Sequence, residues 1–121
     1  MNNYKIGLWG ENQAEEYIKK LGYLVIEKNY HTRYGEIDII AKDNDCLVFI
    51  EVKTRKNNFF GNACEYVDAK KQKKLILTAE QYIQDNPDIE LRFDVIEVYY
   101  SESYDNFSLK NINHIKNAFI T

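Results

Sequence analysis

Two neighbouring segments of this chain alternate apolar and ionisable residues with a period of two, a pattern that a β-strand converts into one charged face. The segments are residues 35–41 and 46–55, and both are rich in isoleucine or valine. Asp38 lies in the first segment, whereas Glu51 and Lys53 share one face of the second. Charged groups among apolar neighbours are costly unless a partner compensates their charge. Because a divalent cation and a phosphate would do so, the pattern predicts an active site.

The polar break at residues 42–45 predicts a tight hairpin that joins the two segments as antiparallel neighbours. A two-residue loop in this break sets Asp38 opposite Glu51 and Glu36 opposite Lys53. Opposed residues share a face, with Cβ atoms about 4.5–5.5 Å apart. We therefore expect Asp38 and Glu51 to hold one metal ion together, with Lys53 beside them. The alternative interpretation is an ordinary charged strand face exposed to solvent.

At these residues the chain resembles a known family. Asp38 followed by Glu51-Val52-Lys53 is similar to the catalytic signature of the PD-(D/E)XK nuclease superfamily, although Ile37 stands where the signature names a proline. The whole chain resembles the small bacterial YraN-like family of predicted endonucleases, which is related to archaeal Holliday-junction resolvases. The matching segments are Gly10-Glu11 with Ala14 and Tyr17-Ile18, residues 35–41, residues 49–55, Lys71-Gln72 with Leu75, residues 92–95, and residues 112–115 with Ala118-Phe119.

The resemblance implies a metal-dependent endonuclease that hydrolyses phosphodiester bonds in nucleic acid. DNA is the expected substrate, and branched or junction DNA is a candidate. The implied cofactor is Mg²⁺ or Mn²⁺, for which carboxylates are suitable ligands. The implied fold is an α/β protein of the restriction-endonuclease-like type, an α/β/α sandwich with a central mixed β-sheet, here as a single domain over residues 1–121. By analogy, a homodimer is expected if two strands are cut.

The candidate catalytic residues are Asp38, Glu51, Lys53, Glu11 and Gln72. Asp38 and Glu51 are the first candidates for metal ligands, and Lys53 is expected to stabilise the charge of the transition state. The resemblance adds Glu11 and the backbone carbonyl of Val52 as ligands, with Gly10 allowing a helix to approach the strands closely. For Glu11 the alternative is an ordinary exposed helix carboxylate. Glu36 is expected to pair with Lys53 or to support the metal site indirectly.

A net charge of −3 argues against a general nucleic-acid binder, but basic residues are concentrated in one region. Residues 53–74 hold seven basic side chains against two acidic ones. We expect phosphate contacts from Arg55, Lys56, Lys70, Lys71, Lys73 and Lys74. The alternative is that the lysines of residues 70–74 form the solvated face of a helix.

Periodicity and capping signals predict two helices and a set of strands. The first helix is expected from Tyr4 to Leu21, with Leu8, Ala14, Tyr17, Ile18 and Leu21 inward and Gly22 as its stop. A second helix is expected from the cap at Asp68 to about Gln84, with Leu75, Ala79, Tyr82 and Ile83 inward. Strands are expected at Tyr23–Tyr30 and Leu91–Tyr100, a loop at Lys56–Tyr66, and a short apolar strand or turn at Leu109–Phe119.

Three function classes stay open on these residues: an endonuclease, a nucleic-acid-binding protein of the same fold that cleaves weakly or not at all, and a structural or assembly protein using a sheet edge and Phe59-Phe60. Two converging carboxylates repel phosphate unless a metal is bound, which favours the endonuclease. Asp94, His31 and His114 are interpreted as structural. No apolar run is long enough to span a membrane, and the two cysteines fit no usual zinc pattern, so a cytoplasmic protein with reduced thiols is expected.

Overall fold

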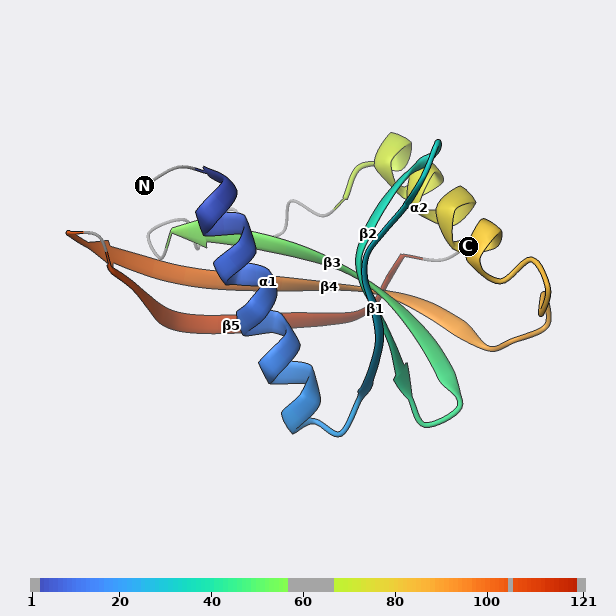
Figure 1. Ribbon diagram of the computed structural model, residues 1–121, viewed down its shortest axis with the longest axis horizontal. Coiled ribbons are helices and arrows are strands. Elements are labelled where there is room, and N and C mark those ends of the chain that lie inside the picture. The colour runs from blue at the N-terminus through green and yellow to red at the C-terminus, as the bar shows by residue number, and fades with distance from the viewer. Residues whose placement is uncertain (1–2, 57–66, 105, 120–121) are drawn as a thin grey trace.

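The computed structural model describes residues 3–56, 67–104 and 106–119 of the chain. The elements, in chain order, are α1 (Asn3–Lys20), β1 (Leu24–Thr32), β2 (Gly35–Asp43), β3 (Cys46–Lys56), α2 (Ala69–Tyr82), β4 (Leu91–Ser103) and β5 (Asn106–Phe119) (Figure 1). The predicted helices and strands are therefore present, with ends that differ by a few residues. In the described part of the chain, no helix is both long and apolar enough to cross a membrane.

The strands form one five-stranded mixed sheet in the order β1-β2-β3-β4-β5. Strands β3 and β4 are parallel, and the other neighbours are antiparallel. A parallel pair needs a long crossover connection, and α2 lies in this one. The prediction of a mixed sheet with two helices is confirmed.

The two helices cover opposite faces of the sheet. On β3, Val48 and Ile50 belong to the core cluster that contains Ala14 and Ile18 of α1. Phe49, between them in sequence, belongs to the other cluster, which contains Leu75 and Ala79 of α2. Because successive side chains of a strand point to opposite sides, α1 and α2 lie on different faces, and the protein has three layers.

The ends of both helices form where the sequence predicts them. Gly22 adopts a φ of 94°, which suits glycine. The N–H groups of Gly22 and Tyr23 donate to the carbonyls of Lys19 and Ile18, each at 3.0 Å, and so end α1. Asp68 caps α2, because its side chain accepts a hydrogen bond from the backbone N–H of Lys71 at 2.8 Å.

One prediction about a helix face is wrong, and one about a strand is correct only in part. Leu8 and Leu21 were expected to face inward, but they are 46 % and 49 % exposed. Helix α1 instead buries Gly10, Ala14 and Ile18, which are spaced four residues apart and form one line against the sheet. The last segment is a final strand as expected, with Ile112, Ile115 and Phe119 packed on the core. It is longer than predicted and its side chains are mostly exposed, because β5 is an edge of the sheet. Residues 57–66, with Phe59 and Phe60, lie outside the described residues.

Strands β2 and β3 separate part of the way along their length. Their ladder runs from Asp43↔Cys46 to Ile39↔Ile50 and ends there. Strand β2 stays paired with β1 as far as Gly35, and β3 stays paired with β4 as far as Lys56. The β1–β2 hairpin therefore diverges from β3, as Figure 1 shows. The fork opens at Asp38 and Glu51, the first residues beyond the last ladder pair, Ile39↔Ile50.

Candidate active site

The side chain of Asp38 occupies the opening of the fork. Its Oδ2 atom accepts a hydrogen bond from the backbone N–H of Val52 at 2.8 Å, so a side chain bonds to β3 where the backbone ladder has ended. Glu51, the residue before Val52, is 8 % exposed. The structure thus brings Asp38 and Glu51 together as counting across the hairpin predicts, although the two residues lie one step beyond the last ladder pair.

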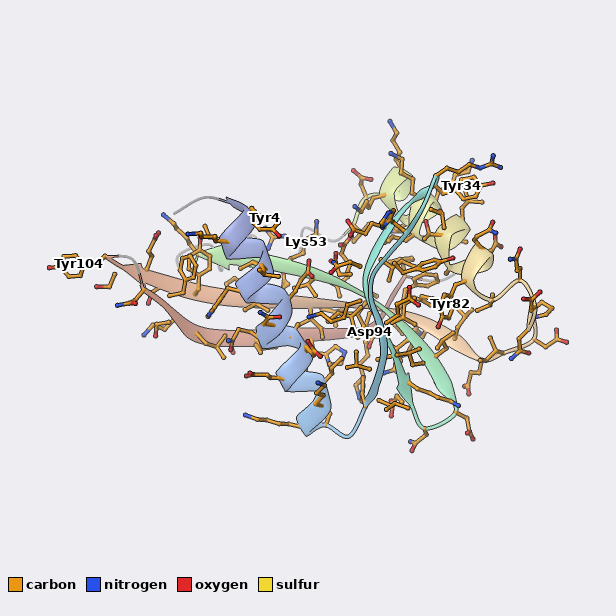
Figure 2. The ribbon with its side chains drawn as sticks, in the orientation of Figure 1. Tyr4, Tyr34, Lys53, Tyr82, Asp94 and Tyr104 are labelled. Carbon is orange, nitrogen blue, oxygen red and sulfur yellow. The ribbon has the colours of Figure 1, made fainter. Side chains whose placement is uncertain are left out.

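These residues line a hollow of about 360 Å³. Its lining residues are Ile6, Gly7, Glu11, Asp38, Glu51, Val52, Lys53, Thr54 and Tyr100. Helix α1 forms one wall, and Figure 2 shows Lys53 on the part of β3 that runs beside the first turns of this helix. The hollow therefore holds two neighbouring carboxylates, a third carboxylate from α1 and one lysine.

The electrostatics of the hollow favour a cation. Burial, together with the hydrogen bond and the charge of Glu51, raises the pKa of Asp38 to about 9, while the Val52 N–H works in the opposite direction. The charge of Glu11 adds to the increase in the pKa of Asp38. Without a cation, Asp38 is therefore protonated at neutral pH. A divalent cation bound there would displace this proton.

One oxygen of Glu51 has no hydrogen-bond partner among the described residues. This atom, Oε2, is buried and lies 3.5 Å from Nζ of Lys71, a side chain on α2 that is 46 % exposed. A buried carboxylate oxygen without a hydrogen bond is costly, and a metal ion would satisfy it. Lys71, which was predicted to contact phosphate, thus reaches the edge of the candidate site.

Helix α1 approaches β3 closely at Gly10. A Cβ atom at this position would overlap the hydroxyl of Thr54 and lie 3.0 Å from its Cβ and Cγ2 atoms. Only glycine fits here without a movement of Thr54 or of the helix, which agrees with the close approach predicted at Gly10. The next residue, Glu11, accepts a hydrogen bond at Oε1 from the side-chain amide of Asn29, at 3.0 Å. The close approach of α1 therefore carries Glu11 to the rim of the hollow.

The hollow is not a preformed cage of protein ligands. Within the described ranges, no three His, Cys, Asp or Glu side chains surround one point closely enough to hold a metal ion. Mg²⁺ is commonly bound by one or two carboxylates and keeps several water molecules. The pair of Asp38 and Glu51, with the Glu51 oxygen that accepts no hydrogen bond from the described residues, fits such an ion.

The predicted pairing of Glu36 with Lys53 is wrong. The β2–β3 ladder ends at Ile39↔Ile50, so Glu36 has no partner across β3 and is exposed, although it stays paired with His31 of β1. It lines a second hollow, which shares Gly7 and Glu11 with the first. The fork is the physical reason, because β2 has left β3 before Glu36 is reached.

Two further candidates are engaged elsewhere. The side-chain amide of Gln72 donates to the carbonyl of Val67 at 2.8 Å, at the start of α2, and Gln72 does not line the hollow. Arg55 lies 3.3 Å from Glu97, whose side chain is 1 % exposed, and Asn113 donates to the other oxygen of Glu97. Arg55 thus compensates a buried carboxylate. Its contact with phosphate and the catalytic role of Gln72 stay predictions.

The remaining predicted phosphate contacts are on the surface. Lys70, Lys73 and Lys74 are exposed on α2, and Lys56 is exposed at the end of β3. The position of Lys70, Lys73 and Lys74 on the helix that carries Lys71 agrees with a basic surface next to the hollow. It agrees equally with a solvated helix face, so their role in nucleic-acid binding stays a prediction.

Asp94 forms a buried network within the sheet, away from Lys53 (Figure 2). It accepts hydrogen bonds from Arg92 Nε and from the backbone N–H of Asn117, each at 3.0 Å. Its other oxygen lies 2.7 Å from Nε2 of His114, whose Nδ1 is 3.2 Å from the hydroxyl of Tyr17. Asp94 and His114 therefore join β4, β5 and α1, which confirms their interpretation as structural residues.

Several residues of the hollow were not predicted from the sequence. Tyr100 reaches it because β4 runs parallel to β3, with Tyr100 paired to Lys56. No local turn links these strands, so their register leaves no short-range signal. Asn29, which lines the neighbouring hollow and contacts Glu11, was also missed. Its ability to adopt positive φ was the available signal, but many exposed asparagines share it.

The fold and the hollow together define a small mixed α/β protein with paired carboxylates and a lysine at a strand fork. A family model described as "Uncharacterised protein family UPF0102" matches residues 10–98, which include Glu11, Asp38, Glu51 and Lys53. A UPF0102 protein of Clostridioides difficile (strain 630) is 49 % identical over 121 residues, covering 98 % of this chain and 100 % of the relative. UPF0102 proteins of Alkaliphilus oremlandii and Syntrophomonas wolfei are 47 % and 40 % identical, each covering 97 % of this chain and 99 % of the relative.

The chain therefore belongs to the UPF0102 family. The resemblance to YraN-like proteins is confirmed at the level of the family. The descriptions of these relatives state no activity.

Proposed function

We propose that this protein is a divalent-metal-dependent endonuclease with a restriction-endonuclease-like fold, which hydrolyses phosphodiester bonds in DNA, including branched or junction DNA. The observation that carries the proposal is the convergence of Asp38, Glu51 and Lys53 on one hollow. Two adjacent buried carboxyl groups, with one oxygen that accepts no hydrogen bond from the described residues and only a half-exposed lysine beside it, are expensive to keep unless they bind a cation. The three-layer arrangement supports the proposed fold.

The proposed metal ligands are Asp38 and Glu51, with Glu11 and the backbone carbonyl of Val52 as additional ligands. The Glu51 oxygen that accepts no hydrogen bond from the described residues and the raised pKa of Asp38 both support cation binding at this place. When bound, Mg²⁺ or Mn²⁺ supplies Lewis-acid polarisation of the phosphate and lowers the pKa of a water molecule.

The chain's own residues have distinct roles in this proposal. The hydrogen bond from Val52 fixes the orientation of the Asp38 carboxylate before any ligand arrives. Lys53 carries a positive charge into the hollow, where it would contact the oxygens of the scissile phosphate and stabilise their growing negative charge. The hollow thus offers acidic groups for a cation and a basic group for the phosphate.

The exposed lysines on α2 would hold the nucleic-acid backbone. Lys71 is closest to the hollow, and Lys70, Lys73 and Lys74 extend the positive charge along the helix. Such contacts supply affinity that is independent of base sequence and falls with added salt. They would place a phosphate near Lys53 without selecting a sequence.

The proposal is tested by incubating the purified protein with labelled duplex, single-stranded, flap and four-way-junction DNA and the matching RNA, in Mg²⁺ or Mn²⁺. Cleavage that requires the metal, stops with a chelator and disappears in Asp38→Asn supports the endonuclease. Tight binding of these substrates without cleavage would instead support the non-cleaving nucleic-acid-binding protein.

A further inference from the structure

An asparagine in the middle of β1 has an unusual backbone conformation beside the candidate site. Asn29 has a φ of 53°, although the ladder between β1 and β2 continues on both sides of it. The flanking pairs are Lys28↔Ile39 and Tyr30↔Ile37, so the register places Asn29 across from Asp38. A positive φ is uncommon for residues other than glycine, although asparagine adopts it more readily than most, and strained conformations tend to cluster at functional sites.

The side chain of Asn29 contacts a second acidic residue of the site. Its Nδ2 atom donates to Oε1 of Glu11 at 3.0 Å. Glu11 lines the hollow that holds Asp38 and Glu51, and it also lines the neighbouring hollow that contains Asn29. Asn29 therefore links the strand opposite Asp38 to the helix that brings Glu11.

We propose that Asn29 is a positioning residue that holds Glu11 at the rim of the hollow, beside the divalent cation that Asp38 and Glu51 would bind. This inference rests on the proposed metal site, but it concerns cation binding and can be tested without measuring cleavage. Residues that orient metal ligands through hydrogen bonds commonly change metal affinity about 10–100-fold when they are replaced.

Asparagine meets two requirements at this position. Its backbone tolerates the left-handed region better than that of most residues. Its amide also donates a hydrogen bond to a carboxylate without adding charge. Glycine would meet only the backbone requirement, and aspartate would place a negative charge against Glu11. The replacement Asn29→Gly therefore removes the hydrogen bond while relieving the backbone.

The adjacent residue offers a matched control. Lys28 also links β1 to α1, through Glu15 at 2.8 Å and Asn12 at 3.3 Å. Neither of these two partners lines the candidate hollow. The replacement Lys28→Met thus weakens the attachment of α1 to β1 without touching Glu11.

The experiment measures Mn²⁺ affinity by calorimetry, and thermal unfolding, for wild type, Asn29→Gly, Lys28→Met, Glu11→Gln and the double variant Asn29→Gly/Glu11→Gln. We expect Asn29→Gly to bind Mn²⁺ about tenfold more weakly, with an unfolding midpoint equal to or above that of wild type. Lys28→Met is expected to unfold at a lower temperature and to bind Mn²⁺ as wild type does. In the double variant, the loss of Mn²⁺ affinity should not exceed the loss caused by Glu11→Gln alone, since Asn29 acts through Glu11.

The inference is overturned if Asn29→Gly binds Mn²⁺ with wild-type affinity, or if its effect persists undiminished in the Glu11→Gln background. It is also overturned if Lys28→Met weakens Mn²⁺ binding as much as Asn29→Gly does. A wild type that binds Mn²⁺ but cleaves no substrate would contradict the proposed function and leave the role of Asn29 intact. A wild type that binds no Mn²⁺ would overturn both.

Discussion

The carboxylate of Asp38 takes the place of a backbone partner for Val52. Its Oδ2 atom accepts the Val52 N–H at 2.8 Å, one residue beyond the end of the β2–β3 ladder. The same carboxylate is hydrogen-bonded to Glu51, and its pKa is raised to about 9. Asp38 thus joins the two strands at the fork and forms part of the candidate metal site.

Replacing Asp38 with Asn separates these two roles. Asn keeps an oxygen that can accept the Val52 N–H, and it is neutral, as Asp38 is at neutral pH without metal. We expect the metal-free Asp38→Asn variant to unfold within about 1 kcal/mol of wild type. Without metal it should bind nucleic acid as well as wild type, because neither side chain then carries a charge that repels phosphate. Chemical denaturation and fluorescence anisotropy measure the two effects; binding that falls with Asp38→Asn would count against this account.

Gly10 is predicted to be intolerant of a side chain. Gly10→Ala forces a Cβ atom against Thr54, and overpacking of this kind costs about 1–3 kcal/mol. Gly7→Ala is the matched control on the same helix, because a Cβ atom there meets nothing within 4 Å. We expect Gly7→Ala to stabilise the protein by up to about 1 kcal/mol, through helix propensity alone. Equal effects of the two replacements in urea unfolding would show that α1 does not approach β3 as described.

Lys71 is predicted to compete with a metal ion for Glu51. Its ammonium forms an ion pair at 3.5 Å with Glu51 Oε2, which accepts no hydrogen bond from the described residues, so removing the ammonium should favour a cation there. We expect Lys71→Met to bind Mn²⁺ a few-fold more tightly, since exposed ion pairs contribute only about 0.2–1 kcal/mol. Lys70→Met, on the same exposed helix surface, is the control and should leave Mn²⁺ affinity unchanged. Weaker Mn²⁺ binding by Lys71→Met would contradict the competition.

The lysines of α2 are predicted to contact phosphate. Replacing Lys70, Lys71, Lys73 and Lys74 with Ala should weaken nucleic-acid binding and reduce its dependence on salt concentration, because fewer counterions are released. The fold should survive, since all four side chains are exposed. Titrations at several salt concentrations, with circular dichroism as the check on folding, measure both effects. Unchanged affinity and salt dependence would make these lysines a solvated face only.

Asp94 is predicted to make the free energy of unfolding depend on pH in the acidic range. Burial raises the pKa of this carboxyl, but hydrogen bonds from His114, Arg92 and the Asn117 N–H outweigh burial and lower it below 3.8. A depressed pKa in the folded state stabilises the protein above the unfolded-state pKa, and this contribution is lost as pH falls below about 3.8. Asp94→Asn should lose about 1.5–3 kcal/mol at neutral pH, because the hydrogen bonds of Arg92 and His114 no longer reach a charged group, while Arg92 keeps its ion pair with Asp43.

Denaturant unfolding at a series of pH values tests this prediction. The stability of Asp94→Asn should fall less steeply than that of wild type as the pH is lowered through the acid range. A variant with the same acid dependence as wild type would show that the network around Asp94 does not set it.

The site could be predicted from the sequence as far as local geometry determines it. The two-residue hairpin loop fixes the pairing of Asp43 with Cys46, and counting from that pair brings Asp38 to Glu51. The same counting fails for Glu36, because the divergence of β2 from β3 depends on how the whole sheet twists.

Relationships between distant segments left no comparable signal. The parallel register that brings Tyr100 to the hollow pairs two strands joined by a long crossover through α2, and no turn encodes it. Leu8 looks like part of an apolar helix face, but the line of contact with the sheet passes through Gly10 and Ala14 instead. The backbone of Asn29 likewise depends on its place beside Asp38, which the sequence alone does not reveal.

The most direct test of the proposed activity is the single-turnover rate of phosphodiester cleavage by wild type, Asp38→Asn and Lys53→Ala, with Mg²⁺ or Mn²⁺ and saturating DNA. We predict metal-dependent cleavage by wild type and a rate about 10²–10³-fold lower for each variant, since each loses one electrostatic contribution to the transition state. A folded wild type with metal bound that cleaves duplex, single-stranded, flap and four-way-junction DNA no faster than Asp38→Asn would contradict the account.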